Sequence, residues 1–225
     1  MKIFSVFLIF MSFQVFAKVD CKKHSIYCQI KKNKPSLSNK YAMRLSNIIY
    51  KMHRKYKIPK HVYTAILMQE SGYNLKAKNC HKGLGWASKR VDEEIQHCLN
   101  PNNAQFDADF CLNNIETHEE MEVCTDFGIS QIYYKTAKKY KFKIHKLNKD
   151  LEYSVEAGAK VLEGFMKRYK KTDKNWWVRY NCGSKGTTKR DTCKIYKKLV
   201  ERYIKWIKKT LKITRKWLKT WVGVN

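Results

Sequence analysis

Acidic side chains are scarce in this chain. Its 225 residues include 19 aspartates and glutamates against 47 lysines and arginines, which gives a formal net charge of +28. Hydrophobic residues still make up 44% of the chain and aromatic residues 13%, so the composition excludes a disordered polycation. Lysine outnumbers arginine, which suits diffuse attraction to anionic partners. A purely compositional preference for lysine is the alternative.

Several diagnostic patterns are missing as well. No two cysteines have Cys-x-x-Cys spacing and no His-Glu-x-x-His segment occurs, so disulfides are favoured over a zinc site. No recognised nucleic-acid-binding motif and no internal repeat is found. We therefore expect no metal, no cofactor and no nucleic-acid partner.

A long apolar run lies at the N-terminus. Lys2 precedes residues 3–16, which are interrupted only by two serines and a glutamine, and Val15 and Ala17 occupy the positions that a signal peptidase reads. This pattern predicts a signal peptide over residues 1–17 and export to the periplasm or beyond the cell. A membrane anchor is the less favoured alternative, because the run is short for a bilayer span.

The cysteine count agrees with export. An even number of cysteines in an exported chain predicts disulfides. All eight are predicted to be bonded: Cys21, Cys28, Cys80, Cys98, Cys111, Cys124, Cys182 and Cys193. Eight cysteines allow about 105 pairings, so most of the connectivity stays open. The favoured single bridge joins Cys182 to Cys193 across a loop of Gly, Ser, Thr and Lys.

Most of the remaining chain has helical periodicity. Ser36 and Ser38 are possible caps of a first helix, Asp150 is a possible cap of a later one, and Pro59 suits the first turn of a further helix. The periodic apolar positions are Tyr41, Leu45, Ile48, Ile49, Met52 and Tyr56 in the first helix, and Leu151, Val155, Ala159, Leu162 and Met166 in the later one. Periodicity fails over 79–125, which holds four cysteines and predicts a disulfide-tied irregular insertion, with a small hairpin as one form.

Glu70 is the first candidate for chemistry. Val62, Ile66 and Glu70 lie four residues apart, so a helix places them on one stripe. A carboxyl group that ends an apolar stripe is partly desolvated, which raises its pKa and lets it donate a proton near neutral pH. Gly72 would break the helix and open space for a ligand. A solvated glutamate at a helix end is the alternative.

Two later segments add polar candidates. Asp126 precedes Phe127-Gly128 and supplies a second carboxylate, as most glycosidases require. Gln131 follows in what we expect to be the start of a helix, where its amide can donate to and accept from a sugar. The alternatives are a helix-capping role for Asp126 and an internal hydrogen bond for Gln131.

Four segments together resemble the lytic transglycosylases, which have a lysozyme-like fold and cleave the glycan strands of peptidoglycan. They are Glu70-Ser71, Gly128-Ile129-Ser130-Gln131, Ala157-Gly158-Ala159 with Leu162, and Tyr180-Asn181-Cys182-Gly183. The resemblance implies a mainly α (α+β) fold and a catalytic acid and base at Glu70. It also implies that Ser71, Gln131, Tyr180 and Asn181 contact the substrate. Arg179 stands where the family has alanine.

The segment around Asp126 leaves the reaction open. It is similar to the segment of animal-type lysozymes that carries their second carboxylate, and equally to small transglycosylases that serve secretion systems and pili. The first similarity implies a muramidase that uses Glu70 and Asp126 and hydrolyses the bond. The second implies a product with an anhydro sugar.

The chain divides into four predicted parts: a signal peptide (1–17), a cysteine-containing segment (18–37), the lysozyme-like domain (38–196) and a basic amphipathic helix (197–225). In the last part Leu199, Tyr203, Ile207 and Leu211 recur at helical spacing among lysines, with Trp206, Trp217 and Trp221. Such a helix is typical of binding to anionic membranes or wall polymers. The alternative, favoured before about Lys208, is a last helix packed on the domain. A non-enzymatic cationic membrane-binding or wall-binding protein remains a further alternative.

Overall fold

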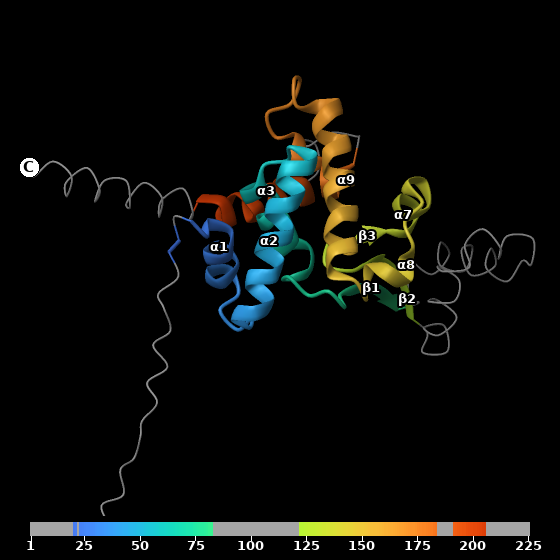
Figure 1. Ribbon diagram of the computed structural model, residues 1–225. Coiled ribbons are helices and arrows are strands. Elements are labelled where there is room, and N and C mark those ends of the chain that lie inside the picture. Colours follow the sequence, from blue (N-terminus) through green and yellow to red (C-terminus); the bar gives the residue numbers. More distant parts are fainter. Residues whose placement is uncertain (1–19, 22, 83–121, 184–190, 206–225) are drawn as a thin grey trace, which may run out of the picture.

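A computed structural model describes residues 20–21, 23–82, 122–183 and 191–205 (Figure 1). The predicted signal peptide, most of the predicted insertion and the chain after residue 205 lie outside the described residues. Within these ranges the protein is mainly helical with one small sheet, as the sequence predicts. No helix in the described ranges is both long and apolar enough to cross a bilayer.

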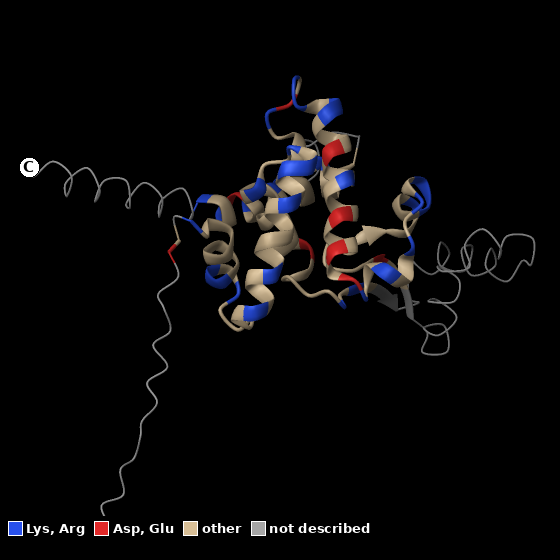
Figure 2. Ribbon diagram, viewed as in Figure 1, with Lys and Arg blue, Asp and Glu red and all other residues tan. Residues whose placement is uncertain are grey.

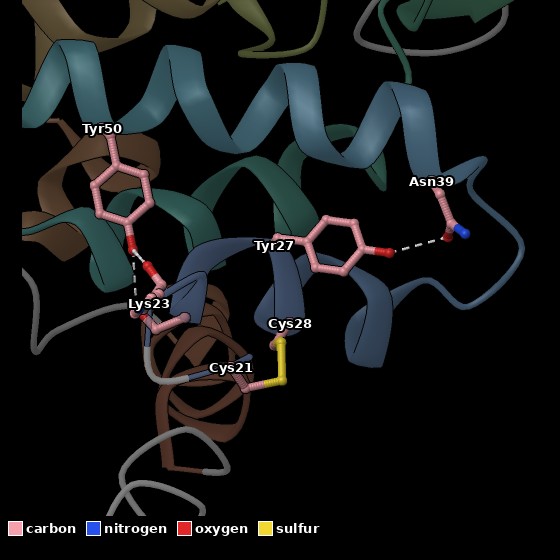
Figure 3. The surroundings of a disulfide bond; sticks show 7 residues. Cys21, Lys23, Tyr27, Cys28, Asn39 and Tyr50 are labelled. Carbon is pink, nitrogen blue, oxygen red and sulfur yellow. Dashed lines mark hydrogen bonds between the residues drawn. A yellow bond between two sulfur atoms is a disulfide. The ribbon is translucent and has the colours of Figure 1, made fainter. Parts of the chain in front are cut away.

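Helices α1 (Ser25–Asn33) and α2 (Asn39–Tyr56) form a packed pair at the N-terminal end of the described chain. A disulfide joins Cys21 to Cys28 in α1, and the Tyr27 hydroxyl donates to Asn39 at 3.0 Å (Figure 3). Ser38 caps α2 as predicted, since its hydroxyl accepts from the Tyr41 amide at 3.2 Å. The N-terminal segment is therefore packed against the domain.

Helix α3 (Lys60–Ser71) begins directly after Pro59. Its C-terminus is set by Gly72, which takes the left-handed conformation with φ 59°. The prediction that Gly72 breaks the helix is confirmed. The space beside it faces Lys34, whose Nζ lies 3.6 Å from where a side-chain Cβ would stand. Gly72 is not among the described residues that line the cleft described below.

Three antiparallel strands form the sheet in the order β1 (Lys78–Lys82), β2 (Glu122–Phe127) and β3 (Ile132–Tyr133). Strands β1 and β2 lie at the two ends of the predicted insertion and pair from Lys78–Phe127 to Lys82–Glu122. The segment between β2 and β3 is a turn, so the expectation that a helix starts at Gly128 is wrong. Helix α7 (Tyr134–Tyr140) starts only after β3.

After the short helix α8 (Ile144–Leu147), the central helix α9 (Leu151–Tyr169) separates two apolar clusters (Figure 1). Asp150 caps α9 as predicted, through the Tyr153 amide at 3.1 Å. One side of α9 packs with α1, α2 and α3 through Val155, Ala159, Leu162 and Met166. Another side packs with β2, β3, α7 and α8 through Ala157 and Val161. Helix α9 is therefore the shared wall of both clusters.

The chain then passes through a 3-10 turn, η1 (Trp176–Val178), and α10 (Arg179–Cys182). The predicted disulfide between Cys182 and Cys193 is present, and it joins α10 to a helical segment over 191–205. The residues that this segment buries are Cys193, Tyr196 and Val200. Leu199 and Tyr203, which the sequence predicts on the apolar face of this helix, are only partly buried. The face that packs on the domain is therefore the neighbouring one, which carries Tyr196 and Val200.

Candidate active site

A cleft of about 650 Å³ opens between α3, the sheet, α7, α9 and α10. Its lining joins residues that lie far apart in the chain. They are Glu70, Asp126, Gln131, Ile132, Tyr133, Thr136, Lys139, Tyr140, Val161, Gly164, Phe165, Arg168, Tyr169, Tyr180, Asn181 and Gly183. The structure thus brings together five of the six residues expected to act on substrate, and only Ser71 is not in the lining.

Glu70 lies in the last turn of α3, on the same helix face as the fully buried Ile66. The pKa of Glu70 is raised to about 7, chiefly because the carboxyl group is buried and to a smaller extent by the negative charge of Asp126. A hydrogen bond from Tyr196 opposes both effects. At neutral pH a large fraction of Glu70 is therefore protonated, while its deprotonated form is also accessible.

Tyr196 is the site residue that sequence reasoning missed. Its hydroxyl donates to Glu70 Oε1 at 2.7 Å, across the interface between α3 and the 191–205 segment. Because this bond favours the charged carboxylate, it lowers the pKa of Glu70. A signal for Tyr196 was present in the sequence. Cys193 lies three residues earlier, and the predicted disulfide turns that helix face toward the domain.

Asp126 lies within β2, which rules out the helix-cap alternative. Its Cα partners in the sheet are Asn79 in β1 and Tyr133 in β3. Its Oδ2 atom accepts from Asn79 Nδ2 at 3.2 Å and from Thr125 Oγ1 at 2.8 Å. A strand pair and two hydrogen bonds therefore hold a second carboxylate at the cleft.

Ser71 and Gln131 both form hydrogen bonds that hold the turn between β2 and β3. The Ser71 hydroxyl donates to the Ile129 carbonyl at 2.7 Å. The Gln131 amide nitrogen donates to the carbonyls of Ala77 at 3.0 Å and Gly128 at 2.9 Å. The internal-bond alternative for Gln131 is therefore realised, while its side chain still lines the cleft.

Tyr180 and Asn181 come from α10. The Tyr180 hydroxyl donates to the Ser130 carbonyl at 2.8 Å, so Tyr180 also supports the β2–β3 turn. Burial is the main cause that raises the pKa of Tyr180, and the charges of Tyr63 and then Glu70 raise it further. Glu70 therefore lies close enough to Tyr180 to act on it electrostatically. Asn181 is exposed at the cleft and is available to a ligand.

Gly128 and Gly158 allow the close packing beneath this turn. Gly128 has φ 76°, and an added Cβ would stand 2.3 Å from the Leu147 carbonyl oxygen. At Gly158 in α9, an added Cβ would stand 2.4 Å from the Ser130 hydroxyl. Larger residues at these positions would push the turn away from α9.

The model of the transglycosylase SLT domain matches residues 47–201. The chain belongs to this family. No curated protein and no solved structure gave a match.

The bounds of the match show which elements of the fold belong to the SLT domain. The match begins within α2, so α1 and the Cys21–Cys28 bridge precede it and pack against it. It ends in the 191–205 segment and thus includes Tyr196. Arg179 pairs with Asp173 at 3.3 Å and lies 3.9 Å from the centre of the Tyr169 ring.

Among the described residues of the SLT domain, no group of three histidine, cysteine, aspartate or glutamate side chains could hold a metal ion. SLT-domain proteins act on peptidoglycan, which suggests a place of action outside the cytoplasm. The family membership thus gives the protein a lytic transglycosylase type of function at family level.

Proposed function

We propose that the protein is an exported lytic transglycosylase that cleaves peptidoglycan between N-acetylmuramic acid and N-acetylglucosamine. The observation that carries the proposal is Glu70: a carboxyl group with a pKa of about 7, placed by α3 in an open cleft. A group that titrates near neutral pH can give up a proton and take one back in the same cycle. Glycosidic cleavage by a single carboxyl group needs both steps.

In the proposed reaction, protonated Glu70 donates its proton to the oxygen that bridges the two sugars. The bond from that oxygen to C1 of the muramic acid breaks, and positive charge develops at C1. The Glu70 carboxylate then removes the proton from the 6-hydroxyl of the same sugar, whose oxygen attacks C1 and forms the 1,6-anhydro ring. Glu70 is again protonated and no water is consumed.

Asp126 supports a second candidate reaction. A carboxylate that β2 holds at the same cleft can stabilise the positive charge at C1 in either route. In a muramidase, Asp126 would either stabilise the positive charge while water attacks C1, or attack C1 itself to form a covalent intermediate that water then hydrolyses. The product has a reducing end in both cases. The family membership favours the anhydro route.

The test uses Glu70→Gln with mass analysis of fragments released from purified peptidoglycan. Glutamine keeps the size of the side chain but cannot donate the proton, so release should fall by at least about 100-fold. The variant no longer buries an ionisable carboxyl group, so its thermal unfolding at pH 8 should be no earlier than that of the wild type. Release near the wild-type rate would contradict the assignment.

The same assay separates the two reactions. A transglycosylase releases fragments with anhydro ends, and Asp126→Asn should retain substantial activity because the nucleophile comes from the substrate. A muramidase releases reducing ends and should lose most activity in this variant. Reducing ends as the main wild-type product would overturn our preference, and no fragments at all would favour a non-enzymatic cationic protein.

A further inference from the structure

The wall of the cleft formed by α7 and α9 differs in charge from the part that holds Glu70 and Asp126. Its charged lining residues are Lys139 from α7 and Arg168 from α9. Among the described residues, neither cation pairs with a carboxylate. The nearby acids are engaged elsewhere: Glu163 with Lys167 at 2.8 Å and Asp173 with Arg179 at 3.3 Å. The cleft thus offers two cations to a ligand.

Aromatic side chains give this cationic wall a defined shape. The Arg168 guanidinium lies 5.4 Å from the centre of the Tyr169 ring, and Tyr169 stacks with Phe165 at 6.4 Å. Tyr140 comes from α7 and approaches α9 at Gly164, where an added Cβ would stand 2.8 Å from the tyrosine hydroxyl. Tyr140 is 38% exposed, so its ring is available to a ligand as well as to this contact.

A neutral sugar strand does not need two cations in its binding cleft. The muramic acid that is cleaved carries a peptide on its lactyl group, and such peptides have free carboxylates. An anion that approached Glu70 and Asp126 would be repelled, whereas the same anion beside Lys139 and Arg168 would be attracted. The charge pattern therefore fits a substrate whose sugar lies at the acids and whose peptide lies at the cations.

We propose that Lys139 and Arg168 form a subsite for the carboxylates of the peptide stem, so that the enzyme prefers peptide-bearing glycan over bare glycan. This inference rests on the proposed function, because it concerns the substrate of that same cleft. Tyr140, Phe165 and Tyr169 provide the apolar surface for the peptide backbone and side chains. Lys139 and Arg168 are specificity-determining residues in this proposal, and Glu70 remains the acid.

The test compares intact peptidoglycan with peptidoglycan whose peptides an amidase has removed and whose freed lactyl carboxylates have been converted to methyl amides, so that the stripped glycan is neutral. The wild type should cleave the intact substrate faster. The double variant Lys139→Gln with Arg168→Gln should reduce that preference by about five- to tenfold, because it loses two exposed ion pairs with the peptide. Its rate on bare glycan should stay nearly unchanged. The matched control is Lys138→Gln with Lys171→Gln, which removes the same charge from exposed positions outside the cleft lining.

Two results would overturn the subsite: an unchanged preference in the cleft variant, or an equal loss in the control, which would assign the effect to diffuse charge. A binding arm separates this question from catalysis. Two variants are compared: Glu70→Gln alone, and Glu70→Gln combined with the two cleft substitutions. The affinity of each is measured for intact and for stripped peptidoglycan. The combined variant should lose affinity only for the intact form, and equal affinities would contradict the subsite even if the wild type cleaved neither substrate.

Discussion

At the scale of single residues, the chemistry depends on a balance at one carboxyl group. Burial and the charge of Asp126 raise the pKa of Glu70, and the Tyr196 hydroxyl lowers it. Without the tyrosine, the pKa of Glu70 would lie higher, because the charged carboxylate would lose a hydrogen-bond donor. In the proposed reaction Tyr196 is therefore a positioning residue, and its hydrogen bond lowers the pH at which Glu70 gives up its proton.

Tyr196→Phe should raise the pKa of Glu70, because the change removes a donor that favours the charged form. The acid step needs protonated Glu70, so the upper limb of the pH–activity profile should move to higher pH. The maximal rate should fall by no more than about 150-fold, since one hydrogen bond to a charged group is worth at most about 3 kcal/mol. The measurement is the rate of fragment release from pH 5 to pH 9.

Tyr27→Phe is the control for this prediction. It also removes a tyrosine hydroxyl that donates a hydrogen bond, here to Asn39 and outside the cleft lining (Figure 3). Its pH profile should match that of the wild type. A Tyr196→Phe profile that coincides with both would show that the tyrosine only fills space.

Sequence reasoning reached Glu70 because helix periodicity is a local property. The stripe through Ile66 needs no knowledge of the rest of the fold, and Ile66 is fully buried as the stripe requires. Tyr196 was missed because its partner lies 126 residues away in the chain. The hydrogen bond from Ser71 to the Ile129 carbonyl was missed for the same reason, because it depends on how separate elements pack.

At the scale of elements, caps and apolar periodicity predicted α2 and α9 well. The exception is the turn from Gly128 to Gln131, whose sequence resembles a helix start. Gly128 has φ 76° and Gln131 has φ 45°, and two left-handed residues in four cannot continue a right-handed helix. The sheet and α9 impose this conformation, since the turn is tied to Ala77 and packed on Gly158.

The Cys182–Cys193 bridge joins α10 to the segment that carries Tyr196. Replacing both cysteines by alanine should lower the free energy of unfolding by about 2–3 kcal/mol. It should also loosen the contact of Tyr196 with Glu70, so the pH profile should move in the direction expected for Tyr196→Phe. Chemical denaturation and the pH–activity profile measure the two effects.

The Cys21–Cys28 bridge is a matched control, because neither cysteine lines the cleft. Its double alanine variant should lose stability and keep the wild-type pH profile. Equal profiles for the two double variants would mean that the Cys182–Cys193 bridge contributes only stability.

At the scale of the whole molecule, several glutamates among the described residues form ion pairs with lysines. Three glutamates of α9 form ion pairs: Glu152 with Lys51, Glu156 with Lys55, and Glu163 with Lys167. Figure 2 shows red segments along α9, with blue segments on neighbouring α2. The cleft differs, since Glu70 has a tyrosine as its hydrogen-bond donor. A strongly basic protein thus keeps two acids, Glu70 and Asp126, at its cleft.

The chain beyond Lys208 lies outside the described residues, and its role stays a prediction. The family match ends at residue 201, so removal of residues 208–225 should leave turnover of short soluble glycans nearly intact. Binding to whole peptidoglycan or anionic vesicles should weaken at low salt. The difference should shrink at high salt, because exposed charges are screened beyond about 10 Å at 0.1 M.

Two results would contradict the predicted role of the tail. Unchanged binding at low salt would mean that its charges are only a solvated face. A truncated protein that fails to fold would mean that the tail belongs to the core, which circular dichroism of the purified variant would show.

The pairing of Lys82 with Glu122 means that the two ends of the segment between β1 and β2 lie side by side. The entropy of closing such a segment grows only logarithmically with its length, by about 0.6 kcal/mol for each doubling. Evolution can therefore lengthen, shorten or exchange this segment without moving Asp126, which lies farther along the same strand pair. The end of the β1–β2 pair is thus a natural grafting point, at which a lineage or an engineer can exchange a segment of the chain without rebuilding the cleft that holds Glu70 and Asp126.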